Sequence, residues 1–132
     1  MVLHHFGVVV DKLEEALPIF QVWMGAKRIG GIVEDEYQQA RIQLFAVGED
    51  AVLEVIEPMT RDASAFHRVG EYHLCFTVPD LDAEMARLHD LGAVVTHAAT
   101  RVPFFADQRI GFMATDSGQL LELLEDPTMP VS

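Results

Sequence analysis

The chain has little of several features that define common protein classes. It contains a single cysteine, Cys75, which excludes an intrachain disulfide and a thiolate metal cluster and favours a reducing cytoplasm. No run of about 20 apolar residues is present, so we expect no membrane span, and the N-terminus does not resemble a secretory signal. Basic residues are also scarce, 9 against 21 acidic ones. The resulting net charge of −12 argues against nucleic acids and anionic membranes as partners.

The remaining composition is that of a folded protein. Half of the residues are hydrophobic and 23% are charged, whereas disordered chains are poor in apolar residues. A length of 132 residues suits one domain, or two small halves that share a core.

The sequence contains an internal repeat. His5 and His73 open similar apolar runs at an offset of 68 residues (73 − 5 = 68). The same offset relates Leu13 to Leu81, Arg41 to Arg109, Leu53 to Leu121 and Glu54 to Glu122. We therefore predict a single domain over 1–132 with two homologous modules, about 1–60 and 70–127, joined by a linker at about 60–70.

Each module has the pattern strand, helix and three further strands. Amphipathic periodicity predicts helices at 12–23 and 81–91, with Asp11 and Asp80 as their N-caps. Apolar runs predict strands at 3–10, 26–33, 39–47 and 51–56, and again at 72–78, 93–97, 108–114 and 119–124. Neither module could bury both faces of its sheet alone, so we expect an α+β fold in which the two pair about a pseudo-twofold axis.

The repeat duplicates one histidine and one glutamate. His5 and Glu54 are separated by 49 residues, as are His73 and Glu122 (54 − 5 = 122 − 73 = 49). Both glutamates lie in apolar runs, where a carboxylate costs free energy unless it is neutralised. Two imidazoles and two carboxylates that converge would bind one divalent cation, with cobalt, nickel, zinc, manganese and iron all compatible. In the alternative interpretation, the histidines pack in the core and the glutamates face solvent.

The paired modules, with histidine on the first strands and glutamate on the last, resemble the vicinal oxygen chelate superfamily. This superfamily includes glyoxalase I, methylmalonyl-CoA epimerases, extradiol dioxygenases and antibiotic-resistance binding proteins. The segments at 3–10, 39–48, 53–58, 65–66 and 70–73 are similar to those of methylmalonyl-CoA epimerases. The resemblance implies a glyoxalase-like fold whose mixed sheet curls around a metal-binding cavity. It also implies a homodimer, and metal ligation by His5, Glu54, His73 and Glu122.

The predicted reaction is proton transfer at a carbon next to a thioester or ketone carbonyl. The cation would stabilise the enolate, while Glu122 as the first candidate base, and Glu54 as the second, remove and return the proton. The substrate would be a small acyl thioester or 2-oxo compound. Two alternatives stay open. One is a glyoxalase I-like lyase that acts on a glutathione hemithioacetal, and the other is a metal-free protein that binds a small drug without catalysis.

Other polar residues allow weaker predictions. Arg41 and Arg109 are repeat equivalents. They are candidates for binding an anionic part of the substrate, or they are solvated residues at the edges of strands. His4 adjoins His5 and must point to the opposite face of the strand, so we do not expect it to be a ligand. We predict a core position for Cys75 and surface positions for the histidines without repeat partners, which are His67, His89 and His97.

Overall fold

The computed structural model describes residues 1–130, apart from the side chain of Phe104. Over these residues the order is β1 (Val2–Val9), α1 (Leu13–Trp23), β2 (Lys27–Asp35), β3 (Ala40–Val47), β4 (Ala51–Pro58), β5 (Tyr72–Val78), α2 (Leu81–Asp90), β6 (Val94–Val102), a short 3-10 helix η1 (Pro103–Phe105), β7 (Gln108–Ala114) and β8 (Leu120–Glu125). The predicted α+β class and the twice-repeated order of one strand, one helix and three strands are confirmed. None of the described helices is long and apolar enough to cross a membrane.

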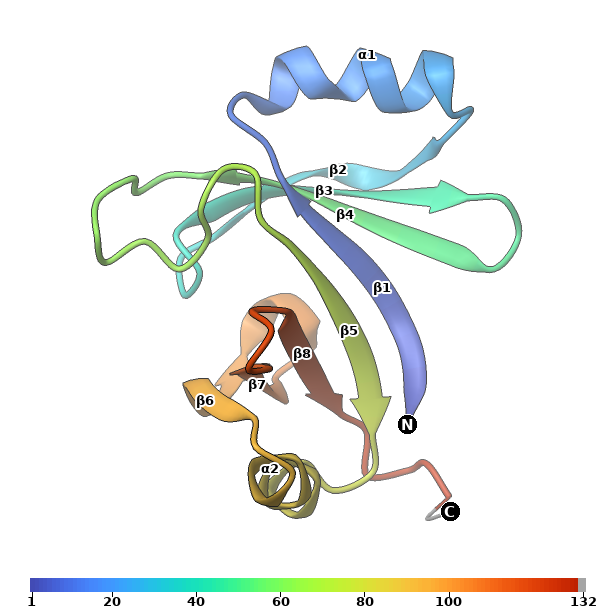
Figure 1. Cartoon of the computed structure of the whole chain (residues 1–132). Coiled ribbons are helices and arrows are strands. Elements are labelled where there is room, and N and C mark those ends of the chain that lie inside the picture. The colour runs from blue at the N-terminus through green and yellow to red at the C-terminus, as the bar shows by residue number, and fades with distance from the viewer. Residues whose placement is uncertain (131–132) are drawn as a thin grey trace. The chain divides into compact units, whose positions relative to one another are not determined.

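The chain forms two compact units. The first unit is His5–Tyr72, and the second unit combines Met1–His4 with the chain from His73 onward. In the first unit the strand order is β2-β3-β4-β1, with β1 parallel to β4 and the other neighbours antiparallel. Helix α1 covers one face of this sheet (Figure 1), because Leu13 and Leu17 pack against Phe45 and Val55.

The start of α1 differs from the sequence prediction. Asp11 does not cap the helix; its carboxylate and backbone carbonyl accept hydrogen bonds from Arg61 instead. The helix begins at Leu13, whose backbone N–H donates to Oε1 of Glu57 at 2.8 Å. A carboxylate from the last strand of the unit thus satisfies a helix N–H that has no partner within the helix.

The second unit repeats this arrangement. Its strand order is β5-β8-β7-β6, with β5 parallel to β8 and the other neighbours antiparallel. Here the predicted N-cap is confirmed, since Asp80 Oδ1 accepts from the N–H of Ala83 at 3.1 Å. The N–H of Leu81 donates to Glu125 Oε2 at 2.8 Å, which matches the role of Glu57 in the first unit.

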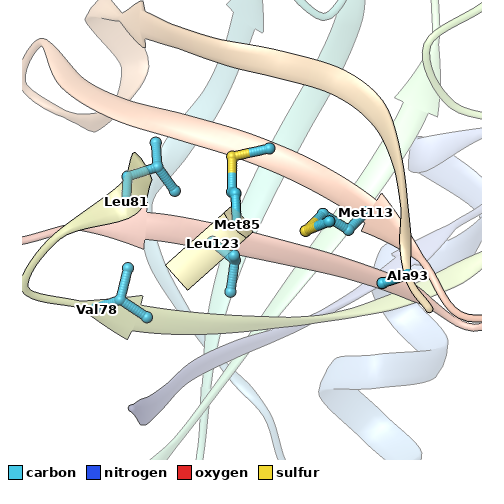
Figure 2. Close-up of a cluster of buried hydrophobic side chains, with 6 residues drawn as sticks. All are labelled: Val78, Leu81, Met85, Ala93, Met113 and Leu123. Carbon is cyan, nitrogen blue, oxygen red and sulfur yellow. The ribbon is translucent and has the colours of Figure 1, made fainter. Parts of the chain in front are cut away.

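A compact apolar cluster joins α2 to its sheet. Figure 2 shows its side chains, which come from β5, α2, β7, β8 and the residue just before β6: Val78, Leu81, Met85, Ala93, Met113 and Leu123. Leu81 is fully buried in this cluster, whereas Leu91, at the other end of the helix, is 73% exposed.

Truncation of Leu81 tests this cluster. Leu81→Ala is expected to lower the free energy of unfolding by about 3 kcal/mol, because it leaves a cavity in a close-packed core. Leu91→Ala is the matched control and should change it by less than about 0.5 kcal/mol. Urea titration followed by circular dichroism measures both, and equal effects of the two substitutions would contradict this packing.

Strand β6 is longer than predicted, because it continues past His97 to Val102. Its pairing with β7 shifts register between Val95 and His97, and again between His97 and Thr100. Such irregularities break the two-residue alternation by which strands are recognised in a sequence. The position of His97 therefore depends on the sheet and not on the local pattern.

Candidate functional site

The first predicted histidine–glutamate pair lies in the first unit. Val55, the residue after Glu54, packs under α1, so Glu54 points to the opposite face of β4. Gly7 of β1 is in register with Glu54, which places His5, two residues earlier, on the same face. His5 Nε2 lies 3.7 Å from Glu54 Oε2, and both residues are only 1% exposed.

The second predicted pair lies in the second unit and is built in the same way. Leu123 packs under α2, so Glu122 points to the other face of β8. Cys75 of β5 is in register with Glu122, and His73 lies two residues before it on the same strand. His73 Nε2 is 3.2 Å from Glu122 Oε1, and both residues are 1% exposed.

These donor sets fit a divalent metal. A carboxylate with 1% exposure must be neutralised by a neighbouring cation, a proton or a metal. Imidazole nitrogen with carboxylate oxygen is a ligand combination typical of zinc, nickel, cobalt, manganese and iron. The alternative that the two glutamates face solvent is wrong, because Glu54 and Glu122 are buried.

Arg41 lies on the other face of the first sheet. It is in register with Glu57, three residues along β4 from Glu54, and it approaches the first turn of α1. Its Nη2 donates to Glu14 Oε1 at 2.6 Å, and its Nη1 donates to Glu57 Oε2 at 2.9 Å. These two hydrogen bonds, the one to Glu14 first, raise the pKa of Arg41 above its ordinary value.

Arg109 occupies the equivalent place in the second unit. Its Nη2 donates to Asp82 Oδ1 at 2.6 Å, its Nη1 lies 3.7 Å from Glu125 Oε2, and the pKa of Arg109 is raised chiefly by Asp82. Each arginine therefore links the first turn of a helix to the carboxylate that holds the start of that helix. This placement favours a structural role for both arginines. It does not support the predicted contact of the arginines with substrate, which stays a prediction.

Replacement of either arginine distinguishes a structural role from a substrate-binding role. Arg41→Met and Arg109→Met are each expected to lower the free energy of unfolding by roughly 1 to 2 kcal/mol, because a charged hydrogen bond to a half-buried carboxylate is lost. Metal content and substrate KM should stay within about twofold of the unchanged protein. Thermal unfolding and steady-state kinetics measure the two effects, and a large rise in KM without loss of stability would restore the substrate-binding prediction.

The surface prediction is wrong for two of the three histidines that have no equivalent in the repeat. His67 is 1% exposed, and its Nε2 donates to Gln38 Oε1 at 2.6 Å, while the Gln38 amide donates to Asp35 Oδ2 at 2.7 Å. His97 is half-buried and its ring packs against Phe112. His89 is exposed and Cys75 is buried, as predicted. No repeat partner marks His67 or His97, so the sequence carries no signal for their burial.

A sequence profile of the glyoxalase/bleomycin resistance protein/dioxygenase superfamily matches residues 4–112. The chain belongs to this superfamily. A search of curated protein sequences found no significant match. The fold and the two histidine–glutamate pairs described above are therefore those of a superfamily member, and the glyoxalase-like fold class is confirmed.

Solved structures similar to this member of the superfamily include methylmalonyl-CoA epimerases. The enzyme from Mycobacterium tuberculosis is 28% identical, with a TM-score of 0.73 over 98% of this chain and 89% of that one. A Streptomyces coelicolor epimerase variant in complex with 2-nitronate-propionyl-CoA is 21% identical, with a TM-score of 0.77 over 96% of this chain and 97% of that one. A hypothetical protein from Bacillus halodurans has the same TM-score of 0.77 at 17% identity and covers 98% of this chain and 97% of that one.

Proposed function

We propose that this protein is a metal-dependent isomerase of the epimerase type. It would move a proton at the carbon next to the carbonyl of an acyl thioester, with methylmalonyl-CoA as the first substrate to test. The observation that carries the proposal is the duplicated histidine–glutamate pair, buried in both units. The 28% identity to the Mycobacterium tuberculosis epimerase over nearly the whole chain supports the same reaction class. A solved methylmalonyl-CoA epimerase with methylmalonyl-CoA bound has the same fold, at 20% identity.

We propose further that the two pairs bind one metal ion together, with His5, Glu54, His73 and Glu122 as its protein ligands. The support for a shared ion comes from the repeat, since modules paired about the pseudo-twofold axis that the repeat predicts would bring equivalent residues around that axis. When bound, a divalent cation acts as a Lewis acid and lowers the cost of negative charge on a carbonyl oxygen. The ion is cobalt, nickel, zinc, manganese or iron, according to the donor set.

The glutamates supply the acid–base chemistry. Glu122 is assigned as the base that removes the proton from the α-carbon, and Glu54 as the group that returns a proton from the opposite side. Burial suits both roles, because solvent water cannot easily reach either carboxylate to compete for the proton. The imidazoles of His5 and His73 lie 3.7 and 3.2 Å from these carboxylates, close enough for each pair to bind the same cation.

Hydrogen exchange at the α-carbon tests the proposed function. Protein loaded with each candidate metal is incubated with methylmalonyl-CoA in deuterated water, and deuterium at the α-carbon is followed by NMR or mass spectrometry. Metal-dependent exchange above the chelator-treated control supports the proposal, and its absence with every metal contradicts it. Two parallel assays address the alternatives. Turnover of glutathione and methylglyoxal would indicate a lyase, and failure to retain any metal would indicate a metal-free binding protein.

We also propose that the protein is a cytoplasmic homodimer, in line with its single cysteine and with its superfamily resemblance. Light scattering during gel filtration should then give about twice the 14.7 kDa chain mass.

A further inference from the structure

The outer face of α1 is apolar over the second half of the helix. Val22 and Trp23 lie three and four residues after Ile19, which places all three side chains on one side of the helix. They are 77%, 80% and 42% exposed, in that order. Leu13 and Leu17, on the opposite side, pack against the sheet below the helix (Figure 1). The helix therefore presents one apolar face to its sheet and a second one to its surroundings.

The repeat shows that a second apolar face is not required by the fold. The 68-residue offset relates Ile19 to Arg87 and Val22 to Asp90 (87 − 19 = 90 − 22 = 68), and both equivalents on α2 are exposed charged residues. Charged and polar side chains are what a helix normally presents to water. The apolar residues at the same positions of α1 therefore indicate that this face is covered when the protein is assembled.

The exposed surface has the size of a small interface. We define the α1 patch as Ile19, Val22, Trp23 and Met24, the last of which ends the helix and is 55% exposed. The α1 patch presents roughly 500 Å² per chain, of which the tryptophan contributes about 200 Å². Two such patches in contact would bury about 1,000 Å², which is the area at which specific protein interfaces begin.

Charged residues at the two ends make the α1 patch complementary to itself. Glu15 lies four residues before Ile19, exposed on the same side of the helix. Arg28 lies beyond the other end, on the α1 side of β2, because it is in register with Phe45, which packs against α1. Arg28 is exposed, and its Nε donates to the side-chain oxygen of Gln43 at 2.9 Å, a neutral group that does not cancel the charge.

We propose that the α1 patch binds the α1 patch of a second copy of this chain, with the two helices antiparallel about a twofold axis near Ile19 and Val22. Each copy then contributes the same surface, as a closed dimer requires. Glu15 of one copy lies beside the C-terminal end of the other helix, where Arg28 is located. The α1 patch itself carries no charge, which favours contact there between two chains of net charge −12. The inference specifies the surface of the proposed dimer and does not depend on the proposed reaction.

Charges placed within the α1 patch test this surface. Val22→Glu and Trp23→Glu are each expected to raise the dissociation constant of the dimer at least about 100-fold, because a carboxylate would be buried at the centre of the interface. Sedimentation over a range of concentrations should then give the 14.7 kDa chain mass in place of twice that value. Leu91→Glu is the matched control, since Leu91 is the repeat equivalent of Trp23 and is 73% exposed on α2. It should remain dimeric.

Reversal of the flanking charges tests the antiparallel arrangement. Glu15→Arg and Arg28→Glu should each weaken the dimer by about tenfold, and the double variant should recover most of the affinity. Parallel helices would not give this recovery, because each residue would then lie beside its own copy. Circular dichroism of every variant confirms that the chain is folded, which is expected because all the substituted side chains are exposed.

Four results would overturn the assignment: an unchanged protein that is monomeric, a dimer that survives both Val22→Glu and Trp23→Glu, dissociation of Leu91→Glu, or no recovery in the double charge variant. A dimer that survives both substitutions would form through another surface and would leave the proposed dimer itself in place. Failure of the proposed reaction is separate. It would appear as absence of α-carbon exchange in the unchanged protein, whatever its mass.

Discussion

Glu122→Gln is expected to reduce α-carbon proton exchange by about 10³-fold, which is the largest kinetic effect among the substitutions considered. Glutamine keeps the size of the side chain and one oxygen, but it cannot accept the proton and no longer carries the charge that attracts a cation. Because Glu122 is 1% exposed, water cannot easily replace it as the base. Deuterium incorporation into methylmalonyl-CoA measures the change.

The second glutamate should give a different result. Glu54→Gln keeps an amide oxygen that can still bind the ion, so at saturating metal it should retain exchange on one epimer and lose interconversion of the two epimers, because Glu54 no longer returns the proton from the opposite side. Chiral analysis of the product separates exchange from inversion. Glu49→Gln is the matched control, because Glu49 lies exposed in the turn between β3 and β4. Full exchange in Glu122→Gln would remove Glu122 from the assignment, and equal behaviour of both glutamine variants would contradict two bases with separate roles.

Removal of one imidazole in either module is expected to eliminate the same metal ion. His5→Gln and His73→Gln should each lower bound metal from one ion per chain to near zero after dialysis, because loss of one of four ligands weakens a shared site as a whole. Two independent half-sites would behave differently, since each substitution would leave the ion of the other module in place. Elemental analysis of the dialysed proteins distinguishes one shared site from two independent half-sites.

A nearby histidine provides the control for this experiment. His4 is exposed and adjoins His5 in the sequence. His4→Gln should therefore leave the metal content at one ion per chain. Stability gives a second readout, because an ion that binds only the folded protein raises the unfolding temperature. Added metal should therefore raise the unfolding temperature of the unchanged protein and of His4→Gln, but not that of His5→Gln or His73→Gln. Metal retention by both His5→Gln and His73→Gln would contradict the proposed ligand set.

Local patterns predicted most of the elements. Alternating and continuous apolar runs gave the strands, and helical periodicity gave α1 and α2 to within about a residue or two at each end, because burial of one face sets the period of the side chains. The 68-residue repeat (73 − 5 = 68) also identified His5 with Glu54 and His73 with Glu122 as equivalent pairs. The structure places the members of each pair on one face and buries them.

Contacts between distant segments decided the remainder. Asp11 binds Arg61 and does not cap α1, and the N–H of Leu13 at the start of that helix donates to Glu57 instead. His67 is buried through Gln38, and His97 is placed by irregular pairing of β6 with β7.

The sequence by itself determined the order of the elements, their duplication and the residue types of the proposed metal site. The order follows from local periodicity, and the duplication and the residue types follow from the constant spacing between the repeats. Only the tertiary structure decided which polar side chains contact one another. Arg41 and Arg109 are repeat equivalents like the four histidines and glutamates, yet they lie beside the helices and not beside Glu54 or Glu122. A one-residue difference in strand position reverses the face on which a side chain lies, and that face is fixed by packing against α1 and α2.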